Sequence, residues 1–268
     1  MKIKDVFLDS ILLIGCGKMG GALLDGWIEN GLKLENAFVI EPKPNKRLQK
    51  LEKRGLTLNP KYALEVGTCI LAIKPQNMDY LLKYFPKKVR FSILISVIAG
   101  TPISKLRDVF GDSKSIYRAM PNTPSLVSAG ITAIYGEEGS NLEKVDLLMS
   151  SVGNTVRLKK EDHIDVATAI SGSGPAYAFL LIEAMALIGV ELGLSKEISL
   201  NLAKNTVFAA GKLCMAVSDS PEILRENVTS PGGTTEAALK ILMNENSLKN
   251  LMGDAIKAAH QRSLELRK

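Results

Sequence analysis

The sequence predicts an α/β fold in which a doubly wound parallel sheet is followed by an all-helical C-terminal domain. Short β-rich runs alternate with helix-like segments up to about Lys160, and this alternation is typical of parallel strands covered by helices. Beyond that point the strand-like runs end and long helix-forming stretches take over. The length of 268 residues is enough for two hydrophobic cores. We therefore expect two domains, residues 1–160 and 161–268.

The elements of the first domain follow from short β-rich runs and from the helical spacing of apolar residues between them. Strands are expected at 11–14, 37–40, 69–73, 93–97, 115–119 and 132–135. Helices are expected at 19–30, 45–54, 78–84, 103–110 and 142–150. Pro42 and Pro75 fall at strand ends or in loops, where proline interrupts no sheet hydrogen bond.

The second domain shows only helical patterns. Pro175 and Pro221 each stand at an expected first helical position, where the missing N–H of proline costs nothing. The segment 196–217 is apolar over much of its surface, so it must be buried in a larger core or against another subunit. Helices are expected at 164–171, 175–192, 196–217, 221–227, 235–244 and 248–266.

Composition and charge exclude several classes of protein. Hydrophobic residues make up 46% of the chain and charged residues 23%, the balance of a folded globular protein. The net charge of +6 comes from scattered lysines and arginines, and no basic run is interleaved with aromatic residues, so we expect no nucleic-acid partner. Cys16, Cys69 and Cys214 are far apart, with neither CxxC spacing nor a nearby histidine, so we expect no metal site and a reducing compartment.

The sequence also predicts a cytoplasmic protein without a membrane span. The N-terminus lacks the long apolar stretch and small-residue cleavage site of a signal peptide. The longest apolar run, 178–194, is interrupted by Glu183 and Glu191, which argues against a transmembrane helix.

A G-x-G-x-x-G motif directly follows the first expected strand and opens the first helix. Gly15 permits a tight turn, Gly17 lets the main chain approach a pyrophosphate, and Gly20 lets helix and strand pack closely. Lys18 and Met19 lie in the first helical turn, whose free N–H groups attract an anion. The motif predicts a Rossmann-like site for NADPH or NADH; a glycine-rich turn without a ligand is the alternative.

The end of the second expected strand bears on the choice of cofactor. Glu41 stands where an acidic residue normally accepts hydrogen bonds from the adenosine ribose of NAD, although it could equally be a solvated loop carboxylate. Lys43, Lys46 and Arg47 follow, and these cations could hold the extra phosphate of NADP. Both cofactors therefore remain open at this point.

Two further strands end in loops at the edge where open α/β sheets bind ligands. Lys74–Pro75 follows one strand and Ala99–Gly100 follows the next, so we expect a cofactor to run over both. Turn formation alone would also explain the proline and the second glycine.

Two loops rich in glycine and hydroxyl residues each begin a helix. They are Ser171–Tyr177 and Val228–Thr235. Helix N-termini of this composition offer several N–H donors beside side-chain hydroxyls, which suits a small carboxylate. A capped interhelical loop explains the first segment adequately, but the second, with Ser-Pro-Gly-Gly-Thr-Thr, holds more than capping requires.

These motifs together give the chain a resemblance to the pyrroline-5-carboxylate reductase family along essentially its whole length. The glycine motif, Lys74–Gln76, Arg118–Pro124, Ser171–Tyr177 and Ser230–Thr235 occur in the family's order, followed by Arg262–Leu266 in the last helix. The Pro-Asn-Thr-Pro and Ser-Pro-Gly-Gly-Thr-Thr strings are the most specific of them.

The resemblance implies an NAD(P)H-dependent oxidoreductase that reduces 1-pyrroline-5-carboxylate to L-proline, the last step of proline biosynthesis. It implies a homodimer interlocked through the helical domain, or a ring of such dimers (a decamer). It assigns Thr235 to the ring nitrogen, as the catalytic residue, and the loop to the substrate carboxylate. The implied substrate-binding residues are Ser230, Gly232, Gly233, Thr234 and Thr235, and Ala99, Gly100, Asn122 and Pro175 join the cofactor-binding residues.

The chain departs from the family pattern at three positions, and two alternative functions are to be compared with the one that the resemblance implies. Cys16 and Lys18 stand where alanine and asparagine are more usual, and Ala238 replaces a common glycine. A β-hydroxyacid dehydrogenase would use a catalytic lysine such as Lys204, but the Gly-Gly-Thr-Thr loop has no place in that chemistry. The other alternative is a nucleotide-sensing protein without turnover.

Overall fold

The structure is a computed structural model, and it describes residues 6–78, 89–112 and 114–267. Contacts divide the chain into two compact units. The N-terminal unit comprises Met1–Ser173 together with Ala259–Lys268, and the helical unit is Gly174–Ala258. The division into domains 1–160 and 161–268 stays a prediction. In the structure, the helix that follows Glu161 packs on strands of the N-terminal unit.

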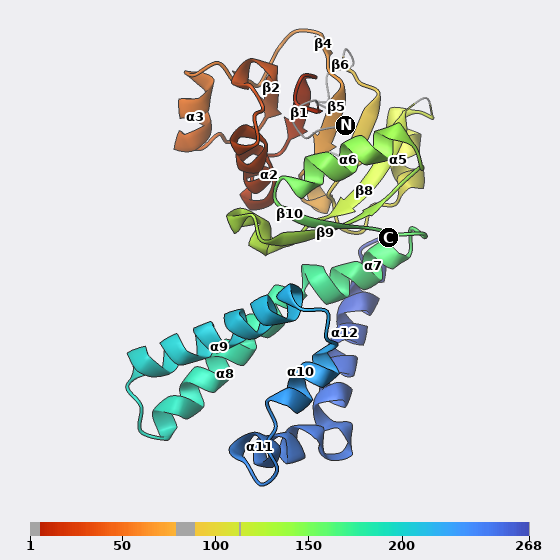
Figure 1. Cartoon of the computed structure of the whole chain (residues 1–268). Helices are drawn as coiled ribbons and strands as arrows, with labels where there is room; N and C mark the ends of the chain where they lie inside the picture. The colour runs from red at the N-terminus through yellow and green to blue at the C-terminus, as the bar shows by residue number, and fades with distance from the viewer. Residues whose placement is uncertain (1–5, 79–88, 113, 268) are drawn as a thin grey trace. The chain divides into compact units, whose positions relative to one another are not determined.

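The N-terminal unit is built on an eight-stranded sheet with the order β10-β9-β8-β7-β5-β1-β2-β3 (Figure 1). Its strands are β1 Ile11–Ile14, β2 Ala37–Ile40, β3 Thr57–Leu58, β5 Thr68–Leu71, β7 Ile93–Ser96, β8 Ser115–Met120, β9 Gly130–Tyr135 and β10 Gly153–Arg157. All neighbours are parallel except β8 and β9, which are antiparallel, so the sheet is mixed rather than purely parallel. Strands β4 Leu64–Glu65 and β6 Val89–Arg90 form a separate parallel pair.

The helices of this unit lie close to their expected positions. They are α2 Lys18–Glu29, α3 Lys46–Glu52, α5 Ile103–Phe110, α6 Ser140–Ser150 and α7 His163–Ala167, with 3-10 turns η1 Leu34–Asn36, η2 Pro75–Asn77 and η3 Thr123–Val127. The helix expected at 164–171 is instead α7 followed by a π-helical turn, η4 Thr168–Gly172. The helix expected at 78–84 lies, after Met78, outside the described residues.

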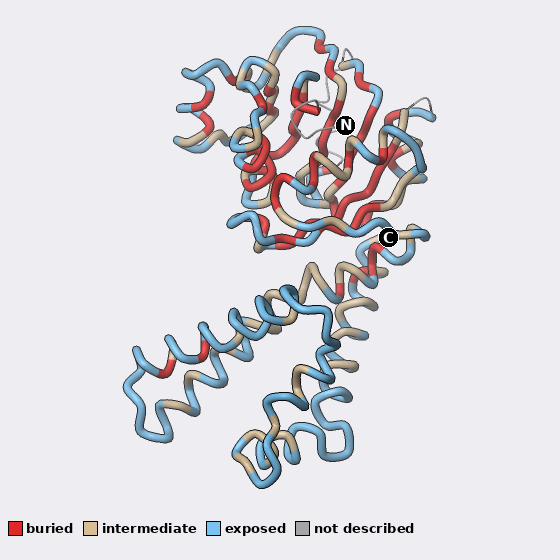
Figure 2. Tube along the Cα trace, viewed as in Figure 1, coloured by how far each residue is buried: buried red, intermediate tan, exposed pale blue. Residues whose placement is uncertain are grey.

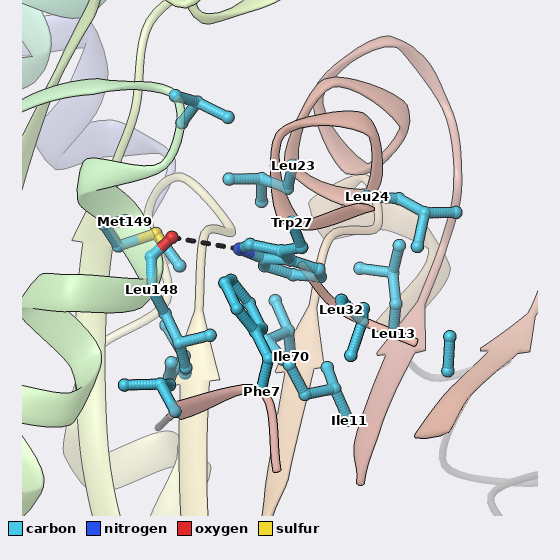
Figure 3. Close-up of a cluster of buried hydrophobic side chains, with 14 of the residues drawn as sticks. Phe7, Ile11, Leu13, Leu23, Leu24, Trp27, Leu32, Ile70, Leu148 and Met149 are labelled. Atoms are coloured by element: carbon cyan, nitrogen blue, oxygen red, sulfur yellow. Dashed lines mark hydrogen bonds between the residues drawn. The ribbon is translucent and has the colours of Figure 1, made fainter. Parts of the chain in front are cut away.

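Alternate residues of the strands feed two hydrophobic cores, one on each face of the sheet, as strand geometry requires. Ile11 and Leu13 pack with α2 and α6, whereas Leu12 and Ile14 pack with α5. Trp27 of α2 is fully buried, and its Nε1 donates a hydrogen bond to the carbonyl of Leu148 in α6 at 2.9 Å (Figure 3). The doubly wound fold is thereby confirmed.

The helical unit holds the remaining helices. They are α8 Gly174–Glu191, α9 Lys196–Ala216, α10 Pro221–Asn227, α11 Thr234–Met243, η5 Asn244–Asn246 and α12 Ser247–Glu265, whose last turns belong to the N-terminal unit. Helices α8 and α9 lie side by side and are joined where Ser199 Oγ donates to the Ala186 carbonyl at 2.6 Å (Figure 1). The same hydroxyl would lie 2.1 Å from a Cβ added at Gly189, so only glycine permits this approach.

The apolar side chains of α8 and α9 are largely exposed in a single chain. Phe179, Leu187 and Phe208 expose 62%, 59% and 67% of their surface, and both helices are mostly exposed along their length (Figure 2). Only Ser199 and Ala203 in α9 are buried. Within one chain, therefore, the expected burial of the 196–217 helix does not occur.

Candidate active site

The ends of five parallel strands gather the predicted cofactor residues at one edge of the sheet. Strands β1, β2, β5, β7 and β8 are mutually parallel, so their carboxyl ends face the same way. The chain proceeds from β1 to β2 on one side and returns to β5 on the other, and this reversal of strand order is where such sheets bind ligands.

Packing requires glycine at two positions of the motif, whereas the third position faces open space. Gly15 has φ +88°, and a Cβ there would lie 2.6 Å from the Ala72 carbonyl oxygen. A Cβ at Gly20 would lie 2.2 Å from the Gly15 carbonyl oxygen. At Gly17, by contrast, a Cβ would meet no atom within 4 Å.

This turn fits a dinucleotide phosphate. Gly17 is the N-cap of α2 and offers no side-chain cap. Among the described residues, no partner takes the main-chain N–H groups of Lys18 and Met19. An open position beside free N–H donors at a helix N-terminus is the arrangement that a phosphate anion requires.

Glu41, at the end of β2, is held firmly beside the glycine turn. Its Oε2 accepts a hydrogen bond from the Cys16 N–H at 2.9 Å, and its Oε1 accepts one from the Lys43 N–H at 3.0 Å. Asn59 clamps the same residue, because its Oδ1 accepts from the Glu41 N–H at 2.9 Å and its Nδ2 donates to the Glu41 carbonyl at 3.0 Å. The role of Asn59 has no signal in the sequence, since it depends on a contact between segments 18 residues apart.

Of the three predicted cations, Arg47 is the one whose charge acts on Cys16 in the glycine turn. Its guanidinium pairs with Asp25 of α2. Burial raises the pKa of the Cys16 thiol to about 11, while the charge of Arg47 acts in the opposite direction. The thiol is therefore protonated at neutral pH and is no nucleophile. Lys43 and Lys46 are exposed.

The second group of predicted cofactor residues lies in the loops after β5, β7 and β8. Lys74 is exposed, and Pro75 begins η2. Gly100 has φ +69°, and a Cβ there would lie 2.5 Å from the Leu266 carbonyl oxygen. The C-terminal end of the chain thus packs directly on the Ala99–Gly100 turn, a second reason for glycine at this position.

Asn122 is buried, and its side-chain amide makes two hydrogen bonds within the protein. Its Nδ2 donates to the Ser171 carbonyl at 3.0 Å, and its Oδ1 accepts from the Ile131 N–H at 2.9 Å. The amide thus joins the start of η3 to η4 and β9. One N–H of the amide and one lone pair of its oxygen remain for a further contact.

A charged cluster joins β8, α7 and the C-terminal residues. It consists of Arg118, Glu161, Asp165 and Arg267 together with the Ser263 hydroxyl. Arg118, Asp165 and Ser263 are buried, and Glu161 and Arg267 are half-buried. The Arg118 guanidinium pairs with Glu161 at 3.1 Å, and the same Glu161 oxygen accepts from the first N–H of α5, that of Ile103, at 2.8 Å. Asp165 accepts from Ser263 Oγ at 2.7 Å and pairs with Arg267.

Burial acts to raise the pKa of Asp165, but hydrogen bonds from Arg267 and Ser263 and the charges of Arg267 and Arg118 hold that pKa below its ordinary value. Asp165 is therefore ionised at neutral pH. The cluster fixes the C-terminal residues that cover Gly100. Sequence analysis did not find it, because its direct contacts join residues up to 102 positions apart in the chain.

The loop predicted to bind the substrate, Ser230–Thr235, lies in the helical unit and leads into α11. Gly232 has φ +70°, and its N–H donates to Glu236 Oε2 at 2.6 Å. The Gly233 N–H donates to the Ser230 carbonyl at 3.0 Å, so it is already engaged. Among the described residues, the N–H groups of Thr234 and Thr235 have no partner.

The remaining predicted substrate and cofactor residues lie in this loop, in α11 and at the start of α8. Ser230 and Thr234 are exposed, Thr235 is half-buried, and Pro175 is the second residue of α8. Sequence analysis overlooked Glu236, although a glutamate at the third position of a helix is a recognised N-terminal signal. In the part of the chain that the structure describes, no group of three or more His, Cys, Asp or Glu side chains could hold a metal ion.

Comparison with known proteins agrees with this arrangement. Residues 161–266 match the family model for pyrroline-5-carboxylate reductase dimerisation, and residues 10–100 match that for NADP oxidoreductase, coenzyme F420-dependent. The pyrroline-5-carboxylate reductase of Synechocystis is 37% identical over 96% of this chain and 97% of its own length. That of Pseudomonas aeruginosa is 33% identical over 96% of each chain.

Solved structures agree over the full length. A pyrroline-5-carboxylate reductase from Coxiella burnetii has a TM-score of 0.85 at 33% identity and covers 97% of this chain and 99% of its own. The Plasmodium falciparum enzyme, solved with NADP bound, has a TM-score of 0.80 at 30% identity, with 97% of this chain and 98% of its own covered. The resemblance seen in the motifs is confirmed, and this chain belongs to the pyrroline-5-carboxylate reductase family.

Proposed function

We propose that this protein reduces the C=N bond of 1-pyrroline-5-carboxylate to give L-proline, with NADPH or NADH as the hydride donor. The observation that carries the proposal is the Ser230–Thr235 loop, which begins α11 with unpartnered N–H groups in a chain related over its full length to pyrroline-5-carboxylate reductases. Neither a β-hydroxyacid dehydrogenase nor a nucleotide sensor needs such a loop. Lys204, the catalytic candidate of the first alternative, is an exposed residue of α9.

The cofactor, when bound, supplies the hydride. In our proposal Gly15 and Gly20 shape the turn, while Gly17 and the N–H groups of Lys18 and Met19 bind the pyrophosphate. Glu41 would accept hydrogen bonds from the adenosine ribose. The proposed cofactor contacts are completed by Lys74, Pro75, Ala99, Gly100, Asn122 and Pro175.

The substrate carboxylate is bound by the N–H groups at the start of α11. Because the Gly233 N–H already donates to Ser230, the donors in our proposal are those of Thr234 and Thr235. Ser230, Gly232 and Gly233 shape the loop around them. The helix N-terminus adds a partial positive charge that favours a carboxylate.

Thr235 orients the ring nitrogen with its hydroxyl. A protonated cyclic imine is electrophilic at carbon, and hydride addition there leaves a neutral secondary amine, so the step requires no strong acid or base in the protein. Correct placement of the imine carbon is then the main contribution of the chain.

The preference between the two cofactors follows from charges around the adenosine ribose. Glu41 favours NADH, because a 2′-phosphate would meet its carboxylate. Lys43, Lys46 and Arg47 favour NADPH, although Arg47 already pairs with Asp25. Initial rates with each cofactor at matched concentrations decide between them.

We also propose that two copies associate through α8 and α9, as a homodimer or within a ring of dimers. The apolar stretch His163–Glu191 is long enough to cross a membrane by length and composition, but it lies wholly within the residues that match the dimerisation model. A partner subunit accounts for its exposed apolar side chains better than lipid does. Light scattering on the purified protein tests this, and a monomer at micromolar concentration would contradict it.

The function is tested by incubating the purified protein with 1-pyrroline-5-carboxylate and NADPH or NADH. We expect oxidation of the cofactor at 340 nm to match the formation of L-proline measured by chromatography. Cofactor oxidation without proline, or no oxidation of either cofactor, would contradict the proposal.

A further inference from the structure

We propose that Glu236 is a positioning residue of the carboxylate-binding loop, and that it selects cyclic imines that carry a carboxylate over those that lack one. This inference rests on the proposed function and adds a residue to it. Glu236 is the third residue of α11, and its side chain turns back to the loop that precedes the helix.

The contact on which the inference rests is short, and it holds a left-handed turn of the loop. Glu236 Oε2 accepts the Gly232 N–H at 2.6 Å, and Gly232 has φ +70°, a left-handed conformation that glycine alone adopts freely. The N-cap of α11, Gly233, has no side chain that could cap the helix. Glu236 is thus the side chain that fixes the loop to the first turn of α11.

The other end of the loop is fixed independently. The Thr229 N–H donates to the Glu226 carbonyl at 2.9 Å, and Thr229 Oγ1 donates to the Arg225 carbonyl at 2.6 Å. Both ends are therefore held before any ligand binds. A preformed loop lowers the entropy that substrate binding would otherwise cost.

These bonds decide which N–H groups remain for a substrate. Glu236 engages the Gly232 N–H, and Ser230 engages that of Gly233. The unpartnered donors that remain among the described residues are the consecutive N–H groups at the first turn of α11. Without Glu236, the Gly232 N–H would be released and the loop could rotate about Gly232, so the donors would no longer be set for a carboxylate.

The negative charge of Glu236 near an anion-binding helix end is offset within the same helix. Lys240 Nζ lies 3.4 Å from Glu236 Oε1, one turn further along α11. One oxygen of the Glu236 carboxylate thus accepts the hydrogen bond from the loop, and the other pairs with the Lys240 ammonium group. This arrangement holds the loop without leaving an unpaired charge to repel the substrate.

The test compares Glu236→Ala and Glu236→Gln with a matched control, Glu222→Ala. Glu222 also lies in the first turn of a helix, α10. Within the described part of the chain its carboxylate pairs with Arg225, at 3.9 Å, and accepts no loop N–H. Each protein is assayed with 1-pyrroline-5-carboxylate and with 1-pyrroline, the same ring without the carboxylate. KM for the cofactor and the inhibition constant of L-proline are measured in parallel.

For Glu236→Ala we expect kcat/KM for 1-pyrroline-5-carboxylate to fall about tenfold, the effect of losing one hydrogen bond to a charged group. L-proline inhibition should weaken by a similar factor, while kcat/KM for 1-pyrroline and KM for the cofactor stay constant. Glu236→Gln should recover most of the loss, because its amide oxygen can accept the Gly232 N–H. Glu222→Ala should change none of these values.

An equal fall for both imines in Glu236→Ala would mean a general structural role and would overturn the inference, as would no fall for either. Failure of Glu236→Gln to recover activity would overturn it too. If the unsubstituted protein forms no proline, the proposed function itself fails, and that result is distinct from an active protein that is indifferent to position 236.

Discussion

The two units of this chain differ in how completely each buries its own apolar residues. The N-terminal unit buries large side chains on both faces of its sheet, Trp27 and Leu13 in one core and Leu12 in the other. The helical unit leaves Phe179 and Phe208 exposed, with little buried surface along α8 and α9. The N-terminal unit, which contains the glycine turn, thus buries its apolar residues within one chain. The helical unit, which lies within the match to the dimerisation model, needs a partner to bury its apolar surface.

The largest expected effect contrasts an aromatic residue from each unit. Trp27→Ala should lower the free energy of unfolding by about 3–5 kcal/mol, because it leaves a cavity and removes the bond to Leu148. Phe208→Ala should instead weaken the association of two copies. Urea denaturation and light scattering measure the two quantities. The contrast between the two units is wrong if Trp27→Ala lowers the free energy of unfolding no more than Phe208→Ala does and dissociates the protein to the same extent.

Substrate chemistry is expected to depend on the helical unit. Thr235→Ala should lower kcat/KM for 1-pyrroline-5-carboxylate about a hundredfold, since the hydroxyl that orients the ring nitrogen is lost. KM for the cofactor should be nearly unchanged, because the glycine turn lies in the other unit. Steady-state kinetics with each substrate varied in turn checks this, and unchanged turnover would remove Thr235 from the mechanism.

The charged cluster should give the N-terminal unit a pH-dependent stability. The pKa of Asp165 is depressed in the folded protein, so its contribution is complete above the pKa of the unfolded chain, about 3.9, and is lost as the pH falls through the folded value. Asp165→Asn should therefore lower the free energy of unfolding by about 2 kcal/mol at pH 7. The difference should shrink in acid. A difference that grows below about pH 4 would contradict the depressed pKa.

The smallest expected effect separates ligand binding from packing within the glycine motif. Gly17→Ala adds a methyl group to open space, so the melting temperature should not change, but KM for the cofactor should rise about tenfold because the pyrophosphate loses close approach. Gly20→Ala is the contrasting variant and should unfold more easily, since its Cβ would meet the Gly15 carbonyl oxygen. Equal melting temperatures for the two variants would refute this distinction.

The local sequence pattern was sufficient to predict the positions of most helices and strands. The strands Ile11–Ile14 and Ala37–Ile40 and the helices Ile103–Phe110 and Pro221–Asn227 begin and end where the sequence predicts. β10 was not predicted, because Gly153–Arg157 is an edge strand with exposed residues and pairs only with β9. The antiparallel direction of β9 was also missed, since periodicity carries no information about strand direction.

The sequence by itself determined which strands and helices follow one another along the chain, where the glycine turn lies, and the family. Each of these depends on residues close together in the chain or on motifs that occur in a fixed order. Only the tertiary structure decided that Asn59 clamps Glu41, that Leu266 covers Gly100, and that Asp165 pairs with Arg267. These contacts join distant segments, and which distant partner a side chain meets depends on the packing of the whole unit.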